Sequence, residues 1–384
     1  MNKKFLSIMA MAACVACSFT ACDDDDDNEE PTNVKVPSVD CDESNLASWG
    51  NYMKVVSKLL VDDATTLYND WAVSYEEGKS YAETFKAEDA TEAAGEIFDG
   101  CEDIANEVGE AKIGDPLSLW NDGKYPQAVL AVESWYSWHS REDYSNNILS
   151  IRNSYYGSRD GKVAESSLSA LYKAAKPELD AKMIEAINNA YNKILAIPNP
   201  FRNNINSAEA LAAQKACGEL SEVIGTLKAA VENLDEAKLK QVVADYVDAV
   251  VVPTYEDLKK NNEALQAACN AFAKNPSDDA FTKCAKAWLN ARVPWETSEA
   301  FLFGPVDEKG LDPNMDSWPL DQDGIENILK SGKFDDLNWS GEFDEDNEDI
   351  ASAQALRGFH TLEFLIFQDG KARTIVKTST STAE

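Results

Sequence analysis

Residues 177–196 read PELDAKMIEAINNAYNKILA, and their apolar residues recur every three or four positions. That spacing matches the 3.6-residue period of an α-helix, so the apolar side chains fall on one face. Pro177 suits the first turn of a helix, where the N–H that proline lacks would have no partner. The stretch therefore predicts an amphipathic helix whose buried stripe consists of Leu179, Met183, Ile184, Ile187, Tyr191, Ile194 and Leu195.

The same helical period governs most of the chain. It recurs in residues 52–71, 220–234, 242–250 and 359–366, whereas the alternating pattern of a half-buried strand is almost absent. Long amphipathic helices joined by polar loops predict an all-α fold made of two packed helical bundles.

Three segments are expected to depart from regular helix. Pro253 lacks an N–H group and should kink or break the helix around it. The run from Gly304 to Gly324 is rich in Asp, Pro and Gly and should be irregular. Residues 341–349 are predicted to form a solvated acidic loop.

The first residues have the layout of a secretory signal. Lys3 and Lys4 precede an apolar stretch, residues 5–21, that is too short for a membrane span. The stretch ends in Phe-Thr-Ala before Cys22, like a bacterial lipoprotein cleavage site whose cysteine receives the lipid. We therefore expect residues 1–21 to be a signal peptide and Cys22 to be lipidated. Cleavage of an ordinary secretory signal nearby is the alternative.

An acidic run follows the predicted lipidation site. Residues 23–27 are all aspartate, and like charges repel one another and bury no apolar surface. Residues 22–44 are therefore predicted to be a disordered tether. The run is also similar to the signal that sends some Gram-negative lipoproteins to the outer face of the outer membrane. A secreted protein anchored by lipid to the outer membrane is expected; surface exposure and a plain solvated spacer both remain open.

The charge and the cysteines exclude several classes of partner and site. The net charge is −33 at pH 7, which excludes nucleic acid and leaves the lipid anchor as the expected contact with a membrane. Removal of residues 1–21 would make the chain still more acidic. Five cysteines remain beyond Cys22, and no CxxC pair stands among them, which argues against a cysteine metal site.

The most informative motif is RGFHTLEFL at residues 357–365. His360 and Glu363 are three positions apart, so on a helix they share one face. An imidazole nitrogen and a carboxylate oxygen can then bind one cation. Gly358, which has no side chain, lets another group approach His360 closely. From these residues alone, a structural His–Glu pair remains the alternative to a metal-binding or catalytic pair.

The Gly-x-His-x-x-Glu pattern followed by an apolar run resembles the signature of the imelysin family, which includes imelysin peptidases and imelysin-like iron-associated proteins. Further blocks resemble other segments of that family, and together they cover most of residues 45–371. These blocks are residues 287–288 with 291–305, residues 317–320, residues 133–137 with Ser140, Asp143, Asn146, Asn147, Ser150, Ile151, Asn153, Tyr155 and Gly157, and residues 196–201.

The blocks stand in the reverse of the family's usual order. By this resemblance residues 45–235 correspond to the later half of the family pattern, and residues 236–371 to the earlier half with the His360 motif. Residues 372–384 are expected to form a flexible tail. A circular permutation would produce this order, and proteins tolerate one where the chain ends lie close together. It predicts that the helix containing Tyr52 begins beside the end of the His360 helix.

The resemblance implies a cleft between the two bundles, with His360 and Glu363 as its metal-binding or catalytic centre. Imidazole with carboxylates suits a hard or borderline cation; iron is favoured, with zinc or calcium as alternatives. A buried polar network that ties the bundles together is the structural alternative. The implied metal ligands are His360, Glu363, Glu296, Glu299, Glu133 and Asp143, and the other implied cleft residues are Ser137, Ser140, Gly358 and Arg292.

Two other features of the sequence indicate a metal site less strongly. His139, the second of the two histidines, is expected at the surface, and the HExxH pattern of metalloproteases is absent. Asp312, Asn314 and Asp316 faintly match a calcium loop. Ser317 stands where such a loop needs glycine, so a turn-rich linker is expected instead.

Three functions remain as hypotheses. The first is a cation-binding or iron-binding lipoprotein in metal uptake, whose partners are a metal ion or iron complex and an envelope transport protein. The second is a peptidase, which the resemblance alone supports. The third is a surface module that binds another protein or a glycan and whose polar cleft is structural.

Overall fold

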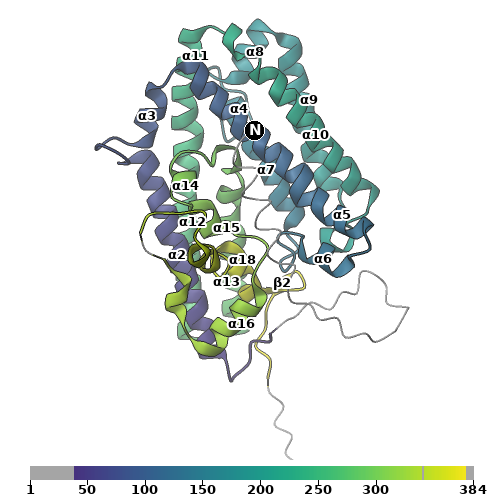
Figure 1. Ribbon diagram of the computed structural model, residues 1–384, viewed down its shortest axis with the longest axis vertical. Coiled ribbons are helices and arrows are strands. Elements are labelled where there is room, and N and C mark those ends of the chain that lie inside the picture. Colours follow the sequence, from purple (N-terminus) through teal and green to yellow (C-terminus); the bar gives the residue numbers. More distant parts are fainter. Residues whose placement is uncertain (1–38, 340, 378–384) are drawn as a thin grey trace, which may run out of the picture.

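The chain is almost wholly helical in the computed structural model, which describes residues 39–339 and 341–377 (Figure 1). The predicted all-α fold is therefore confirmed. The predicted signal peptide, Cys22 and most of the predicted tether lie outside the described residues. The described strands form one short hairpin, in which β1 (Phe367–Gln368) pairs antiparallel with β2 (Lys371–Ala372).

Eight of the described helices pack as two groups of four. In one group α2 (Leu46–Ala72) lies along α12 (Val252–Lys274), α13 (Asp278–Glu296) packs on α12, and α18 (Gly358–Ile366) packs on α2 and α13 (Figure 1). In the other group α4 (Ala90–Asn106) packs on α7 (Ser140–Tyr156) and α10 (Ala208–Lys228), and α9 (Pro177–Ala196) packs on α7 and α10. Helix α2 precedes the predicted boundary at residue 235, yet it packs on helices that follow that boundary.

The other described elements connect the two groups and cover their ends. They are α3 (Tyr81–Ala87), η2 (Glu107–Gly114), α5 (Asp115–Asn121), α6 (Tyr125–Leu130), α8 (Leu168–Ala175), η3 (Phe201–Asn203), η4 (Val231–Asn233), α11 (Glu236–Tyr246), η5 (Val247–Val251), η6 (Glu299–Phe301), α14 (Pro305–Glu308), α15 (Leu311–Asp316), α16 (Gln322–Ser331), η7 (Phe334–Leu337) and α17 (Glu348–Gln354).

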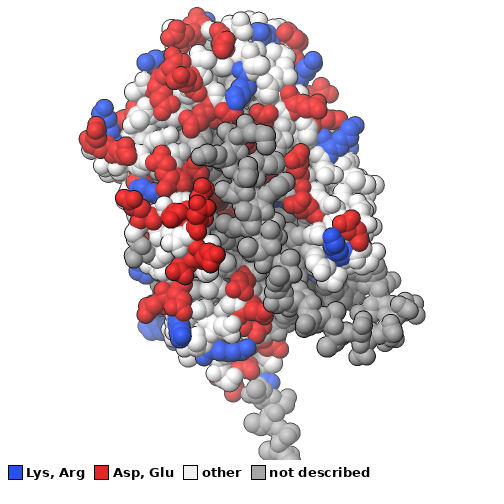
Figure 2. Space-filling model, viewed as in Figure 1, with Lys and Arg blue, Asp and Glu red and all other residues white. Residues whose placement is uncertain are grey.

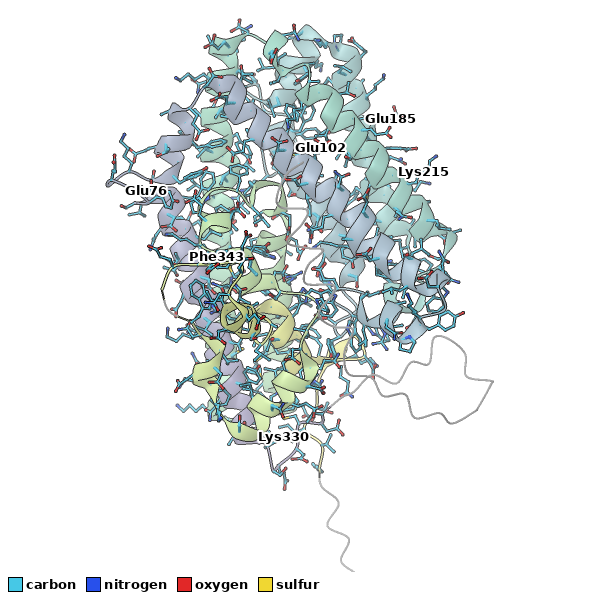
Figure 3. The ribbon with its side chains drawn as sticks, viewed as in Figure 1. Glu76, Glu102, Glu185, Lys215, Lys330 and Phe343 are labelled. Atoms are coloured by element: carbon cyan, nitrogen blue, oxygen red, sulfur yellow. The ribbon has the colours of Figure 1, made fainter. Side chains whose placement is uncertain are left out.

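Helix α9 shows why the apolar period predicts the fold. Pro177 is its first residue, and Met183, Ile187 and Ile194 from the predicted stripe are fully buried. Polar residues on the opposite face are exposed, and Glu185 and Lys215 project from the outer surface of α9 and α10 (Figure 3). Acidic side chains are scattered over the face shown in Figure 2, in keeping with the negative net charge.

Pro253 does not break its helix. Helices α11, η5 and α12 follow one another without interruption, and the five residues before Val252 form a π-helical turn. A π-turn is wider than an α-turn, so it gives room to the proline ring and removes the need for the N–H that proline lacks.

The region from Gly304 to Gly324 also differs from the irregular segment that we expected. It contains α14 and α15 and the start of α16. Proline and glycine act here as helix boundaries, since Pro305 opens α14 and Gly310 precedes α15 in a left-handed conformation. None of the helices within the described residues is both long enough and apolar enough to span a membrane.

The start of α2 lies beside the end of α18, as a circular permutation requires. The indole Nε1 of Trp49 donates a hydrogen bond of 2.9 Å to the carbonyl oxygen of Leu365. Further along, the amide of Val376 donates to the carbonyl oxygen of Cys41 at 2.8 Å. The permutation itself stays a prediction, but its geometric condition is met.

The first part of the expected flexible tail is held in place. Arg373 is 3 % exposed, and its guanidinium group donates to the carbonyl oxygens of Phe364 and Val39. The amide of Ile375 donates to Asp278 at 2.8 Å. These contacts fix residues 372–377, and residues 378–384 lie outside the described residues.

Candidate functional site

Gly358 lies where two helix ends that are far apart in the sequence meet, the end of α15 and the start of α18. Its φ angle is +90°, and a Cβ atom there would lie 2.4 Å from the carbonyl oxygen of Met315. Only glycine tolerates this conformation and this approach. The sequence predicted that Gly358 lets another group come close to His360, and that group is the end of α15, which carries Asp316.

His360 is fully buried among carboxylates. Its Nδ1 lies 3.0 Å from Oε2 of Glu363, in the geometry of a hydrogen bond. Its Nε2 lies 3.1 Å from Oδ1 of Asp316 and 3.3 Å from Oε1 of Glu133. No described group forms a well-aligned hydrogen bond with Nε2, although the atom is buried. The ring of Trp318 covers the imidazole with centroids 4.8 Å apart.

A tight loop before α7 brings Glu133 and Ser137 to the imidazole. Ser134 and Trp138 have φ angles of +54° and +60°, a conformation that is unfavourable for residues other than glycine. The backbone amide and the hydroxyl of Ser137 each donate to Oε1 of Glu363 at 2.8 Å. The hydroxyl of Ser140 donates to the carbonyl oxygen of Glu133. Ser140 therefore supports the loop and does not contact His360.

Arg292 links the carboxylates of both helix groups. Its guanidinium Nη2 lies 3.1 Å from Glu133 and 3.4 Å from Asp143, and it also contacts Glu296. Its Nη1 binds Asp316. A guanidinium ion with several donors suits this role, because each buried carboxylate needs a compensating charge.

Glu296 and Glu299 lie at the end of α13 and the start of η6. Glu296 is fully buried and accepts a hydrogen bond of 2.5 Å from the side-chain amide of Asn147. Glu299 is 7 % exposed, and no side chain within the described residues forms a hydrogen bond or ion pair with its carboxylate. Oxygen atoms from Glu296, Glu299 and Asp316 all lie within 4.8 Å of one another.

Sequence reasoning missed Asp316 and Lys112. Asp316 was assigned to a turn-rich linker, but it ends α15 and accepts a hydrogen bond of 2.6 Å from the indole of Trp295. Lys112 lies in the π-helical η2, where its ammonium group is 2.9 Å from Glu133 and 3.5 Å from Glu107. Two signals pointed to Asp316: the faint calcium-loop match, and the block at residues 317–320 that directly follows it.

The electrostatic environment shifts several pKa values. Burial opposes the charged form of His360, but Asp316, Glu133 and Glu363 outweigh it and raise the imidazole pKa well above its ordinary value. Burial also opposes ionisation of Glu133, but Lys112, His360 and Arg292 hold its pKa well below the ordinary value.

The acids further from His360 are shifted in the opposite direction. Burial raises the pKa values of Glu296 and Glu299 well above the ordinary range, against the attraction of Arg292 and Lys112 respectively. Burial, with Glu107 and Asp316 nearby, raises the pKa of Asp312 to about 7. Part of this negative charge is therefore neutralised by protons unless a cation is present.

The structure brings all the predicted ligand residues into one buried network, though not into one coordination sphere. Glu133 and Asp316 surround His360 Nε2, whereas Glu363 contacts the other ring nitrogen. Asp143 is reached through Arg292 and accepts from Ser134 at 2.6 Å.

His139 lies at the edge of this network and is partly exposed. Its Nε2 is 3.8 Å from Asp143. It therefore contacts the network without contributing to the group of atoms around His360.

A model of the imelysin family, described as Peptidase M75: Imelysin, matches residues 23–227 and 251–383. The chain belongs to the imelysin family. A crystal structure of an imelysin peptidase from Bacteroides ovatus is 51 % identical with a TM-score of 0.86, covering 90 % of this chain and 100 % of that one. The all-α architecture described above is thus the imelysin fold.

Two relatives are iron-regulated proteins. Iron-regulated protein A of Synechococcus elongatus is 31 % identical over 144 residues, which are 38 % of this chain and 36 % of that protein. The chain therefore aligns with only about a third of that curated relative. An iron-regulated protein A precursor from Parabacteroides distasonis is 39 % identical with a TM-score of 0.40, over 43 % of this chain and 51 % of that one.

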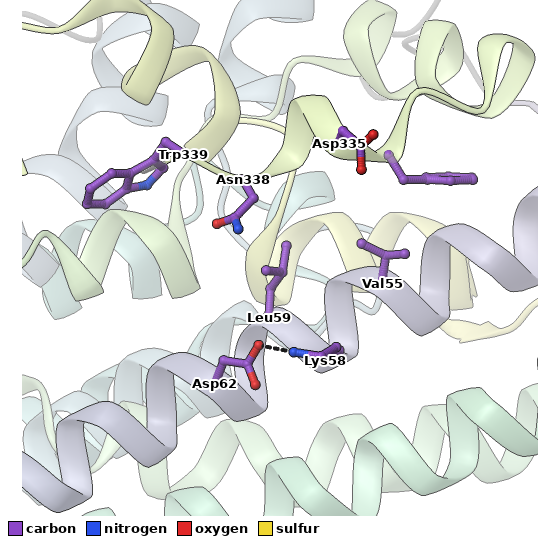
Figure 4. A pocket seen from close by; sticks show the side chains of 8 residues that line it. Val55, Lys58, Leu59, Asp62, Asp335, Asn338 and Trp339 are labelled. Carbon is purple, nitrogen blue, oxygen red and sulfur yellow. Dashed lines mark hydrogen bonds and ion pairs between the residues drawn. The ribbon is translucent and has the colours of Figure 1, made fainter. Parts of the chain in front are cut away.

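The imelysin chain also has a surface groove that contains none of the predicted site residues (Figure 4). Leu59 and Val55 of α2 form its floor, and Trp339 and Asn338 approach from the segment after η7. Lys58 and Asp62 in this groove pair with each other, and the carboxylate of Asp335 also lines it.

Proposed function

We propose that this protein binds a metal cation, iron being favoured, at His360, Glu133 and Asp316, and that it serves metal uptake at the cell envelope. The observation that carries the proposal is the state of His360 Nε2. This atom is fully buried, lacks a well-aligned hydrogen bond, and lies within 3.3 Å of two carboxylate oxygens. A cation at this point would give Nε2 a partner and would join it to the two carboxylate oxygens, which already accept from Arg292.

Glu363 prepares His360 for this role. Once Nε2 has released its proton, an Nδ1–H group that donates to Glu363 leaves the lone pair of the imidazole on Nε2, which faces the other two ligands. Because the raised pKa of His360 keeps that proton in the metal-free protein, a cation binds by displacing it. Ser137 in turn holds Glu363 through two hydrogen bonds of 2.8 Å. Such outer contacts fix the ring orientation and the tautomer of a metal-binding histidine.

The donor set determines which cations fit. One imidazole nitrogen with carboxylate oxygens suits iron, zinc or manganese, and calcium would use the oxygens alone. Iron is favoured because a relative bears the name iron-regulated protein A. His360 is closed to solvent and Glu133 is 4 % exposed, so binding requires the surrounding side chains to move.

The proposal also includes the location of the protein at the outer membrane. The predicted signal peptide, the lipid on Cys22 and the acidic tether would hold the protein at the outer membrane, where cations are captured before transport. The strongly negative charge supports cation capture, because it raises the local concentration of cations. A transport protein of the envelope would receive the cargo.

Calorimetric titration of the mature chain with Fe²⁺ (without oxygen), Zn²⁺, Mn²⁺ and Ca²⁺ tests the proposal. We expect binding of at least one of the first three, lost in His360→Ala and retained in His139→Ala, which removes the other histidine. Absence of binding, or equal binding by His360→Ala, would reject the proposal.

A further inference from the structure

Helices α12 and α13 form a hairpin whose facing residues are in register. The loop at residues 275–277 joins the two helices, and the rings of Phe272 and Phe281 meet with centroids 4.2 Å apart. These two residues lie symmetrically about the peptide bond between Pro276 and Ser277. Because both helices rise by the same amount per residue, equal steps away from the loop reach facing positions.

Cys269 and Cys284 occupy the facing positions one helical turn further from the loop. Each is three residues beyond the phenylalanine of its own helix, and residues with this spacing share one helix face. Leu265 and Trp288 continue the two stripes, and the cysteines and these two residues are all fully buried. The two cysteines thus face each other in the core of the hairpin.

Contact between the two thiols agrees with this register. A hydrogen bond with the Cys284 thiol, together with burial, raises the pKa of Cys269 well above its ordinary value. Ser57, a buried residue of α2, forms a hydrogen bond with the Cys269 thiol that opposes this rise in pKa. Both cysteines are free thiols in this structure. They therefore form a dithiol pair at the contact of three helices.

We propose that Cys269 and Cys284 are a redox pair that forms a disulfide bond between α12 and α13. The bond closes the loop made by residues 269–284 and stabilises the hairpin by restricting the unfolded chain. Neither cysteine belongs to the network around His360, so the inference is independent of the cation site. Disulfides persist outside the cytoplasm, where the location proposed above places the protein.

The oxidant is another disulfide, either on a thiol-oxidising protein or in a small molecule such as oxidised glutathione. One cysteine thiolate attacks a sulfur of the oxidant, which forms a mixed disulfide and releases one thiol. The second thiolate attacks the protein sulfur of that mixed disulfide, forms the bond between the two cysteines and releases the second thiol. The protein loses two protons and two electrons, and the oxidant gains them. Because both thiols are closed to solvent, the exchange requires the hairpin to be open.

Oxidation of the purified chain, residues 23–384, by oxidised glutathione tests the proposal wherever the protein is located. This chain has five cysteines, and maleimide labelling after denaturation counts the free thiols by mass spectrometry. We expect three labelled cysteines after refolding in the oxidant, and the same count when the folded, reduced protein is held in it until labelling is constant. Trypsin should release residues 261–274 linked to residues 284–286. Five labelled cysteines, glutathione on either cysteine, or a different linkage would overturn the proposal.

Two variants distinguish this bond from other oxidation. Cys284→Ser should leave all four remaining cysteines labelled, whereas Cys217→Ser, in α10, should leave two labelled and keep the linked peptide. The oxidised wild-type protein should melt about 5 °C above its reduced form, and this difference should vanish in Cys284→Ser. An equal or lower melting temperature after oxidation, or an equal rise in Cys284→Ser, would overturn the stabilising bond.

Discussion

Oδ1 of Asp316 lies 3.1 Å from Nε2 of His360, and the two residues belong to different helices, α15 and α18. Gly358 makes this contact geometrically feasible, because its missing side chain leaves room for the backbone of Met315. The candidate site therefore depends on the close approach of the α15 and α18 backbones at Gly358 as much as on its ligands.

Replacement Gly358→Ala should destabilise the protein by about 2–3 kcal/mol and weaken cation binding, because a Cβ atom is incompatible with both the φ angle and the close contact. Urea denaturation measures the first effect and calorimetry the second. Gly95→Ala in α4 is the matched control: its Cβ would have no neighbour within 4 Å, so stability should be unchanged or rise by about 0.5–1 kcal/mol. Equal effects of the two replacements would contradict this role of Gly358.

Replacement Glu363→Gln should reduce cation affinity by about 10–100-fold while the ligand atoms around Nε2 remain. The physical reason is that a neutral amide holds the Nδ1–H group less strongly than a carboxylate does. Calorimetry measures the change, and Glu326→Gln on α16, where Glu326 pairs with Lys330 outside the buried network, serves as the control. An unchanged affinity would show that Glu363 does not orient His360.

Replacement Arg292→Met should destabilise the protein by about 3–5 kcal/mol at pH 7, because it leaves buried carboxylates without their counter-charge. The loss should be smaller at pH 5, where those carboxylates take up protons more readily. Urea denaturation at both pH values measures the difference. A loss that grows at pH 5 would contradict the ion-pair role.

The stability of the metal-free protein should fall as the pH rises above neutral. The folded-state pKa of His360 lies well above its ordinary value of 6.5, so the folded protein holds a proton that the unfolded chain releases. This contribution is fully present below pH 6.5 and is lost as the pH rises through the folded-state pKa. Denaturation between pH 6 and pH 9 should show a weaker pH dependence in His360→Asn than in the wild-type protein. An equally strong dependence in the variant would assign it to other groups.

A reverse permutant should fold. Its chain would begin at Leu234, before the helix cap Asp235, and a short Gly/Ser linker would join Lys377 to Val39. The hydrogen bond of 2.8 Å between Val376 and Cys41 shows that these ends are close. The free energy of unfolding should change by no more than about 2 kcal/mol. An unfolded product would weaken the case for a natural permutation.

The helical fold could be predicted because burial follows the apolar period, as in α9, where Met183 and Ile187 face the core. The unbroken helix at Pro253 could not be predicted, because the π-turn before it has no apolar period of its own.

The site could be predicted only in part. His360 and Glu363 share one helix face, which their spacing reveals. The convergence of Asp316 and Lys112 on Glu133 depends on tertiary packing of short or irregular elements, α15 and η2, which no periodic pattern predicts. Only the resemblance to the imelysin family identified Glu133 and Ser137 in advance.

Anomalous diffraction from a crystal soaked with Fe²⁺ tests the central proposal most directly. We predict a peak at the iron absorption edge within bonding distance of His360 Nε2 and of carboxylate oxygens from Glu133 and Asp316. The absence of a peak there in a fully soaked crystal, with Nε2 hydrogen-bonded to a carboxylate, would contradict a metal site at His360.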